Sequence, residues 1–427
     1  MAREMKDSGV EWIGEIPKEY RVYRLKHLLR KPLDYGANSS GVEYSDDLPR
    51  YIRITDIAAD GKLKNDGALS IKLEDTSPYL LEDRDILFAR SGATVGKSFI
   101  YYAEYGRAAF AGYLIRAQLN EEIVPEYVYY YTCSTGYDIW KNGIFIQSTI
   151  QNISADKYAN LPIVLPETKG EQICIANFLK DVCTELDNVL EKTRASIEEY
   201  KKLKQAVITQ AVTKGVRGDR EMKDSGIAWV GEIPAEWEVS QVKYSLRWKS
   251  EKGQSQEEVL SLYRDYGIVP KDSRDDNHNV TSLDTSGYKV VDIGDFVINK
   301  MKAWQGSMAV SEYRGIISPA YHVCKFTNDK INRKYFHYLM RNKSYIPEYT
   351  RLSTGMRVGQ WDLGFNDFKN IPFLLPPQGE QQEIVNYLDR KCSAIDELIT
   401  KKEQYLSEIE NYKKSLIYEY VTGKKEV

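Results

Sequence analysis

The sequence predicts an α+β protein in which an internal duplication has produced two globular mixed α/β domains, each followed by a long helix. Three observations predict this fold class: a lead-in segment that occurs twice, a long helical pattern with heptad spacing that occurs twice, and short β-rich runs between them. The length of 427 residues suits two or three domains, each long enough to bury a core.

The duplication is visible in two pairs of repeated segments. Residues 3–17 read REMKDSGVEWIGEIP and residues 220–234 read REMKDSGIAWVGEIP, so 12 of 15 positions are identical. Downstream, LPIVLPETKGEQ at 161–172 matches IPFLLPPQGEQ at 371–381 with one residue deleted. Because the same segments recur in the same order at a spacing far longer than a solenoid repeat, they indicate a domain duplication.

Each second repeat leads into a long helix. From Glu171 to Val212 there is no glycine or proline, and apolar residues recur at steps of three and four. This spacing is typical of a coiled coil, and matched length and register suit two helices that pair with each other. Two unrelated surface helices, each packed on its own domain, are the alternative. The expected coiled-coil and partner-binding residues are Leu179, Val182, Leu186, Val189, Leu388, Ile395, Leu398 and Ile409, with Leu203, Tyr405 and Tyr412 continuing the pattern.

The middle segments differ in sequence but share a skeleton. DILFAR at 85–90 parallels DFVINK at 295–300. Runs such as YIRITDI at 51–57 and YKVVDIGDFVIN at 288–299 are rich in β-forming residues and are broken by Gly and Asp, which indicates mixed α/β structure. The resulting division is a lead-in at 1–22, a domain at 23–166, a central helix at 167–217, a second lead-in at 218–239, a second domain at 240–376 and a C-terminal helix at 377–427.

Composition narrows the class of protein. No stretch approaches the roughly 18 consecutive apolar residues of a membrane span, and MAREMKDSGVEW lacks the apolar core of a secretory signal. Five scattered cysteines exclude a Cys-rich zinc motif and argue against a disulfide scaffold. We therefore expect a cytoplasmic protein that does not act at a membrane. The 32 tyrosines favour β-rich cores, with an apolar, hydrogen-bonding surface as the alternative.

Charge alone does not point to nucleic acid. The net charge of −3 shows no basic excess, so a nucleic-acid-binding function would need basic residues clustered on one face.

The motifs of catalysis are missing from the sequence. The stretch from Ser91 to Ser98 resembles a phosphate-binding P-loop, but Gly92 and Gly96 enclose three residues where that motif needs four. The four histidines show no metal-ligand spacing, and there is no nucleophile elbow, dinucleotide fingerprint or Asn/Asp-Pro-Pro-Tyr/Phe methyltransferase tetrapeptide. We therefore expect no catalytic residue, no metal and no cofactor in this chain.

Because the motifs of catalysis are missing, binding is the function that these sequence patterns favour. Arg and Lys suit phosphates and guanine edges, while Asn and Gln suit adenine edges. Lys300, Lys302 and Trp304 alternate, so in a strand they would share one face. Polar loops at 147–152 and 353–357 add short donors, although solvated surface loops are the alternative. The candidate binding residues, which the resemblance described next assigns to DNA contact, are Arg53, Arg90, Ser91, Lys97, Ser148, Thr149, Gln151, Asn152, Lys300, Lys302, Gln305, Ser353, Thr354 and Arg357.

Taken together, these features resemble the specificity subunit of a type I restriction–modification system over nearly the whole chain. The resemblance is carried by the repeated DSG-x-x-W-x-GEIP lead-ins, both LP/IP…GEQ segments, the DILFARSG turn, NKMKAWQG at 299–306 and Ser-Thr-Gly at 353–355. The first half has Ser-Thr-Ile at 148–150, so a role for that glycine does not carry over.

The resemblance implies a division of labour. Two target-recognition domains would each bind one half of a bipartite, asymmetric site in double-stranded DNA. The long helices would pair as an antiparallel coiled coil, separate the domains and dock two modification subunits. S-adenosylmethionine, ATP and Mg would belong to the modification and restriction subunits, leaving this chain a non-catalytic recognition subunit.

Two other functions stay open at the level of sequence. One is a specificity subunit of another methylase or nuclease system, and the other is a coiled-coil scaffold that joins two protein-binding domains. A steep salt dependence would distinguish DNA binding from the scaffold.

Overall fold

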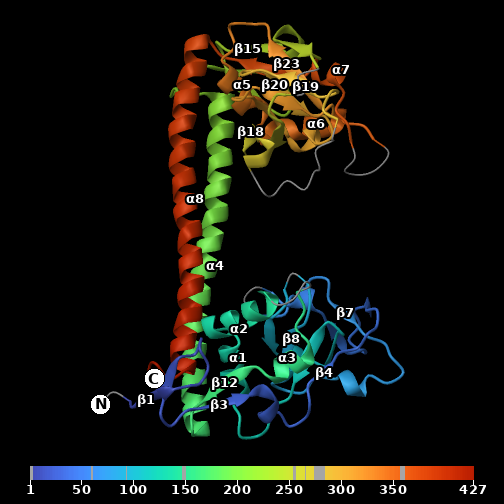
Figure 1. The fold of residues 1–427 in the computed structure, drawn as a ribbon. Coiled ribbons are helices and arrows are strands. Elements are labelled where there is room, and N and C mark those ends of the chain that lie inside the picture. Colours follow the sequence, from blue (N-terminus) through green and yellow to red (C-terminus); the bar gives the residue numbers. More distant parts are fainter. Residues whose placement is uncertain are drawn as a thin grey trace. The chain divides into compact units, whose positions relative to one another are not determined.

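The computed structural model describes residues 3–58, 61–92, 94–146, 151–252, 256–264, 266–273, 284–355 and 361–427. The chain divides into two compact units (Figure 1). The first unit combines Met1–Ala195 with Glu403–Val427, and the second unit is Ser196–Lys402. Each unit therefore holds one mixed α/β domain together with a part of both long helices.

The first unit is organised around two four-stranded sheets. Its strands are β1 (Met5–Asp7), β2 (Glu15–Pro17), β3 (Arg21–Arg24), β4 (Asp34–Tyr35), β5 (Val42–Glu43), β6 (Arg50–Ile52), β7 (Leu69–Ser70), β8 (Ile86–Ala89), β9 (Ser98–Ile100), β10 (Ala108–Phe110), β11 (Leu114–Ala117) and β12 (Pro162–Leu165). The central sheet has the order β4-β11-β8-β9, and the other has the order β10-β6-β7-β5. Strands β1 and β2 form one antiparallel pair, and β3 and β12 form another.

Strand β8 explains why this domain shows a continuous apolar run. Ile86 and Phe88 belong to the core that includes helices α1 (Pro125–Tyr131) and α2 (Thr135–Ile146), whereas Leu87 and Ala89 belong to a separate cluster on the other side. Because neighbouring strand residues point to opposite faces, a strand covered on both faces is apolar throughout. The short helix α3 (Ala155–Ala159) precedes β12.

The second unit repeats the central sheet of this plan, with the two-stranded pairs β17-β18 and β19-β22 in place of the other four-stranded sheet. Its strands are β13 (Met222–Asp224), β14 (Glu232–Pro234), β15 (Glu238–Gln241), β16 (Leu246–Lys249), β17 (Leu260–Tyr263), β18 (Gly267–Pro270), β19 (Lys289–Val291), β20 (Phe296–Asn299), β21 (Met308–Val310), β22 (Gly315–Ile317), β23 (Tyr321–Phe326) and β24 (Pro372–Leu375). The sheet β16-β23-β20-β21 has the same order as β4-β11-β8-β9, and β15 pairs with β24 as β3 pairs with β12. Its helices are α5 (Arg333–Met340), α6 (Ile346–Leu352) and α7 (Phe365–Phe368).

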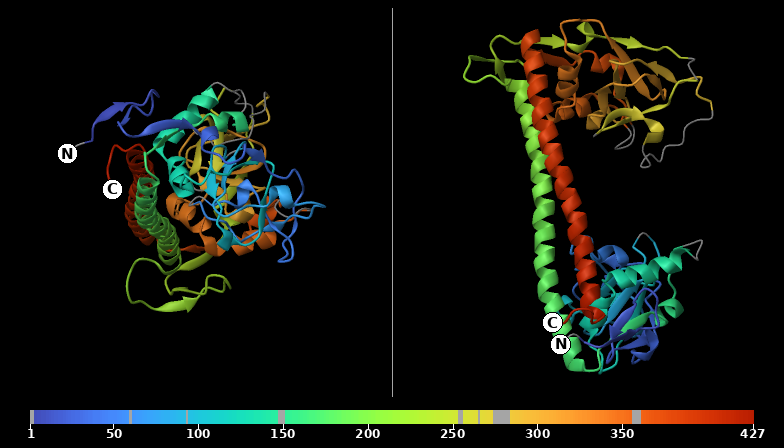
Figure 2. Two further views of the ribbon diagram at one scale, coloured as in Figure 1. Left: turned by 90° about the horizontal axis from the view of Figure 1, so that it is seen from below. Right: turned by 60° about the vertical axis from the view of Figure 1, so that its left-hand side comes forward.

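The predicted long helices are confirmed. Helix α4 is Lys169–Lys214 and helix α8 is Gln378–Val421, and they lie side by side in every view (Figures 1 and 2). In the first unit, Asp187 contacts Lys413 at 2.6 Å. In the second unit, Lys204 contacts Asp396 at 2.6 Å. Because higher numbers on α4 face lower numbers on α8, the pairing is antiparallel.

The seam between α4 and α8 corrects part of the sequence prediction. Leu179, Leu388, Ile395 and Ile409 are buried as expected, and Val182 and Leu186 are half-buried. Val189 and Leu398, however, are 39% and 42% exposed. Their neighbours Leu190 and Ile399 are the buried residues instead. In α8 the buried residues Leu388, Cys392, Ile395 and Ile399 follow the alternating steps of four and three that a coiled coil requires. Ile409 and Leu416 are also buried, seven residues apart.

Each lead-in segment is fixed to the start of the helix in its own unit. In the first unit, Tyr20 donates a hydrogen bond of 2.7 Å to Glu171, and Arg3 lies 2.7 Å from the same carboxylate. In the second unit, the Trp237 indole donates a 3.0 Å hydrogen bond to Glu380, and Arg220 lies 2.6 Å from it. The near-identical lead-ins therefore perform the same structural task twice.

The tyrosines divide between the two interpretations, because ten are buried and nine are exposed. The fully buried ones in the two cores are Tyr20, Tyr127, Tyr131, Tyr137, Tyr158, Tyr335, Tyr345 and Tyr349. Among the described residues, no helix has both the length and the apolar character that crossing a membrane would require.

Candidate nucleic-acid interface

The same local structure follows the central strand in both units. In the first unit, β8 ends at Ala89 and leads into the first turn, Arg90–Lys97. In the second unit, β20 ends at Asn299 and leads into the second turn, Lys300–Gly306. The backbone N–H of Arg90 donates to the Tyr113 carbonyl at 3.0 Å, and that of Lys300 donates to the Ala320 carbonyl at 3.2 Å. Both turns are therefore held at the equivalent end of the equivalent strand.

Each turn is joined to a residue that follows the polar loop of its own domain, directly in the first unit and six residues later in the second. The Ile153 N–H donates to the Arg90 carbonyl at 2.9 Å, and the Leu363 N–H donates to the Lys300 carbonyl at 2.9 Å. Ile153 and Leu363 are fully buried and anchor these junctions. Candidates that lie about 60 positions apart in the sequence thus come together twice, in the same way.

The first turn carries unsatisfied polar atoms. The Arg90 guanidinium lies 4.8 Å from the ring centre of Tyr35, as a cation–π pair. Ser91 forms an isolated β-bridge with Asn152. The Arg90 Nε and the Asn152 Oδ1 are buried and have no hydrogen-bond partner within the described part of the chain. Gln151 is exposed beside them. Ser148 and Thr149 lie outside the described residues.

Two other candidates of the first unit hold the protein's own backbone. Lys97 donates to the carbonyl of Ala58 at 2.5 Å. Arg53 binds Asp56 with two hydrogen bonds, of 3.0 and 2.7 Å, and also donates to the carbonyl of Gly67. In this arrangement Arg53 and Lys97 shape the segment between β6 and β7, and their cationic groups are already engaged.

The second turn does not continue strand β20. A 3-10 helix, η7 (Ala303–Gln305), replaces the strand in which Lys300, Lys302 and Trp304 would have shared a face. The backbone N–H of Lys302 bonds to the Asn299 carbonyl, and Gly306 ends the helix with a φ of 79°. The turn hydrogen bonds and this left-handed glycine therefore exclude the alternating arrangement.

The side chains of the second turn and its polar loop make different contacts. Lys300 pairs with Asp362 at 3.4 Å, whereas Lys302 is exposed and has no ion-pair partner among the residues described. Gln305 is half-buried in η7. In the second polar loop, Ser353 donates to the Tyr349 carbonyl at 2.7 Å, and Thr354 bridges Asp362. Arg357 lies outside the described residues.

Basic side chains lie close enough to one another beside the second turn to affect each other's pKa. Burial lowers the pKa of Lys289, and the charges of Lys300 and Lys252 lower it further. Burial likewise lowers the pKa of His322, with Lys289 as the next cause. Since each cation disfavours the protonation of its neighbours, this group would be stabilised by an anion.

Sequence reasoning missed one aromatic residue at the edge of each central sheet. Tyr35 on β4 is 41% exposed, and Trp248 on β16 is 50% exposed. Trp248 contacts His322, with ring centres 6.3 Å apart, and the His322 ring lies 3.3 Å from the Leu363 carbonyl. A single aromatic in a short strand carries no pattern of its own, so only the fold shows that both lie beside the turns.

The residue types around these two turns suit the binding of nucleic acid. Cations, amides and exposed aromatic rings surround each turn, a set that suits phosphates, base edges and base faces. Within the described ranges, no group of three or more His, Cys, Asp or Glu side chains is arranged to hold a metal ion.

Comparison with known proteins gives consistent findings. Residues 46–199 and 234–410 match the family described as Type I restriction modification DNA specificity domain. The putative type I restriction enzyme MjaX specificity subunit of Methanocaldococcus jannaschii is 28% identical over 424 residues, which are 96% of this chain and 95% of that protein. The MjaVIII specificity subunit of the same organism is 23% identical over 367 residues, covering 81% and 80%.

A solved structure supports the fold. It comes from a study of complex assembly and conformational transition of the type I R-M system. The likeness has a TM-score of 0.68 at 14% identity and covers 96% of this chain and 99% of the other.

Proposed function

Since this chain belongs to the family of type I restriction–modification specificity subunits, whose general function is DNA-target recognition, we propose that it reads a bipartite, asymmetric site in double-stranded DNA. Each domain reads one half-site. The chain directs modification and restriction subunits to the site and performs no catalysis itself. S-adenosylmethionine, ATP and Mg bind to those partner subunits.

The observation that carries this proposal is the repeated junction of turn and polar loop. Both domains place a basic residue at the equivalent end of the equivalent strand, and in both one backbone hydrogen bond joins it to a distant residue that follows the polar loop. The side chains around the junction differ: Arg90, Ser91 and Asn152 in one unit, and Lys300, Lys302 and Gln305 in the other. One backbone arrangement that carries two different sets of side chains suits two different half-sites.

Single variants in each unit test this assignment. We expect Gln151→Ala to weaken binding or relax discrimination in one half-site only, and Lys302→Ala to affect only the other half-site. Both residues are exposed, so the fold should be unchanged. The expected loss is about 1–3 kcal/mol, or roughly 5- to 150-fold in affinity, if the contact is to a base.

The measurement is the affinity of the full chain, with its modification subunit, for duplexes altered one base pair at a time. Lys330→Ala, an exposed change away from both turns, is the control. Effects of one variant on both half-sites would contradict the assignment of one half-site to each domain.

A second apolar row on the long helices supports partner docking. Leu398, Tyr405 and Tyr412 stand at seven-residue intervals on α8 and are 42%, 50% and 56% exposed. On α4, Val189 and Leu203 are 39% and 48% exposed. Exposed apolar residues in a row mark protein–protein contact, and we propose that two modification subunits bind here.

Replacing this row should separate assembly from DNA binding. We expect Leu398→Ser, Tyr405→Ser and Tyr412→Ser together to reduce modification-subunit binding at least about tenfold, because each removes a buried apolar contact of about 1 kcal/mol or more. Affinity for DNA by the chain alone should stay the same. Size-exclusion chromatography of the mixed subunits measures the first effect, with Lys401→Ala and Glu408→Ala together as the control. Unchanged assembly of the triple variant would exclude this surface.

A further inference from the structure

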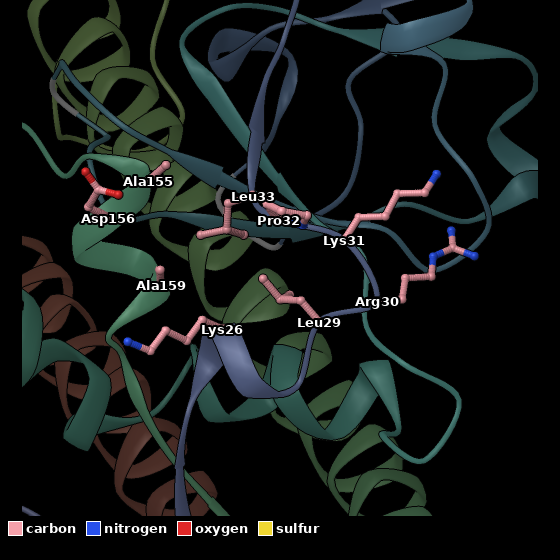
Figure 3. Close-up of a pocket in the computed structure, with 9 residues that line it drawn as sticks. All are labelled: Lys26, Leu29, Arg30, Lys31, Pro32, Leu33, Ala155, Asp156 and Ala159. Atoms are coloured by element: carbon pink, nitrogen blue, oxygen red, sulfur yellow. The ribbon is translucent and has the colours of Figure 1, made fainter.

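Two basic pockets occur at matching places in the two units. The first basic pocket, of about 330 Å³, is shown in Figure 3 and is lined by Lys26, Leu29, Arg30, Lys31, Pro32, Leu33, Ala155, Asp156 and Ala159. The second basic pocket, of about 280 Å³, is lined by Lys243, Leu246, Arg247, Trp248, Thr327, Phe365 and Lys369.

Backbone contacts show that the two pockets are equivalent. Each lies between a short 3-10 helix, η1 (Leu25–His27) or η5 (Val242–Tyr244), and the short α-helix before the last strand of the domain, α3 or α7. The Leu28 carbonyl accepts from Asn120 N–H at 2.9 Å, and the Ser245 carbonyl accepts from Thr327 N–H at 2.9 Å. This register aligns Lys26 with Lys243 and Arg30 with Arg247. The middle segments have diverged, yet this lysine and arginine are the same in both.

The pockets combine an apolar floor with basic rims. In Figure 3, Leu29 and Leu33 lie in the middle of the first pocket, Arg30 and Lys31 extend on one side, and Lys26 lies on the other, below Ala159. The first pocket also contains Asp156; the register places Asn366 at the matching position in the second unit. A DNA backbone presents apolar sugar edges and anionic phosphates, so a floor of this kind with cations on both sides suits it.

Most of these cations are available to a ligand. Lys26 and Arg247 are exposed and have no ion-pair partner in the part of the chain that the structure describes. Arg30 pairs with Glu82 at 2.5 Å, but both side chains are about half exposed, so this pair is weak. Lys243 lies over the ring of Tyr244, and Lys369 donates to Asn366.

Each pocket is linked to the turn in its own unit by a chain of side-chain contacts. In the first unit, Ala155 of the pocket donates its N–H to the Tyr35 hydroxyl at 3.1 Å, and Tyr35 contacts Arg90. In the second unit, Trp248 of the pocket contacts His322, whose ring lies near Leu363 at the junction with Lys300. A DNA strand whose bases face the turn can therefore reach the pocket with its backbone.

We infer that the two basic pockets bind DNA phosphates beside the half-sites, through Lys26 and Arg30 in one unit and Lys243 and Arg247 in the other. The inference rests on the proposed function. The two half-sites differ in bases but share the sugar–phosphate backbone. Residues that both domains retain at equivalent positions therefore suit the backbone, whereas the divergent turns and loops suit the bases.

The test compares two double variants, Lys26→Gln with Arg30→Gln and Lys243→Gln with Arg247→Gln, with Lys391→Gln and Lys401→Gln as a charge-matched control on α8. All six residues are exposed. Fluorescence anisotropy of the full chain would measure affinity over a range of salt concentrations for a duplex that carries the target and for one of random sequence. We expect each pocket variant to bind both duplexes at least about tenfold more weakly, and the slope of log affinity against log salt to fall by about 2.

The outcomes separate this inference from the proposed function. No salt-dependent DNA binding by the unaltered chain would contradict the proposed function itself. Binding by the unaltered chain, with pocket variants that keep its affinity and salt slope, would overturn the pockets alone. A pocket variant that relaxes discrimination at one base pair, without weakening binding to random DNA, would also overturn the phosphate assignment.

Discussion

Inserting four residues into both long helices is expected to lengthen the spacer between the two half-sites by one or two base pairs. Four helical residues add about 6 Å of length, and one base pair of DNA rises about 3.4 Å. The original target should lose at least about a hundredfold in affinity, because one half-site would no longer be in place and each unread base pair costs about 1–3 kcal/mol. The measurement is the methylated DNA motif in cells that express the variant.

The antiparallel pairing supplies a sharp control. Lys402 of α8 lies over the ring of Tyr200 of α4, at 5.7 Å, so insertions after these two residues face each other. An insertion after Tyr200 alone should shift α4 against α8 and abolish methylation, whereas the double insertion should restore it with a longer spacer. A double variant that methylates the original motif would show that helix length does not set the spacer.

Replacing Glu380 by alanine should destabilise the second unit strongly. Glu380 is fully buried, and its carboxylate accepts the Trp237 indole N–H and pairs with the mostly buried Arg220. The variant would leave the Trp237 indole without its acceptor and would take the buried carboxylate from Arg220, which keeps only the partly exposed Glu236 at 3.0 Å, at a cost of about 3–5 kcal/mol. For a unit of this size that corresponds to a melting temperature lower by roughly 6–20 °C. Differential scanning calorimetry of the full chain measures it.

Two matched carboxylates test whether burial sets the size of this loss of stability. Glu171 makes the equivalent contacts in the first unit but is 24% exposed, so Glu171→Ala should cost less. Glu383 makes an exposed ion pair with Arg217, and Glu383→Ala should leave the melting temperature nearly unchanged. Equal effects of all three substitutions would contradict the burial argument.

The duplication and the long helices could be predicted because both are repeated, long-range patterns. The exact seam could not. Val189-Leu190 and Leu398-Ile399 are pairs of adjacent apolar residues, and either member fits a spacing of three or four. Only the packing partner decides which is buried, and the structure buries Leu190 and Ile399.

The candidate site was predicted in parts but not as a whole. Residue type identified Arg90, Lys300 and the polar loops, yet no sequence pattern indicates that Ile153 and Leu363 join each loop to its turn. Arg53 is a candidate by its charge, whereas its bidentate contact with Asp56 depends on the local fold. Lys26 and Arg30 match Lys243 and Arg247 at the same sequence offset as the two lead-ins, but only the fold shows that they line pockets.

The most direct test of the proposed role is a single-molecule methylation map of DNA from cells that express this chain with its modification subunit, compared with cells lacking this chain alone. We predict a split, asymmetric methyladenine motif that disappears when the chain is deleted. Methylation that is unchanged by the deletion, or a palindromic motif, would contradict a subunit that reads two different half-sites.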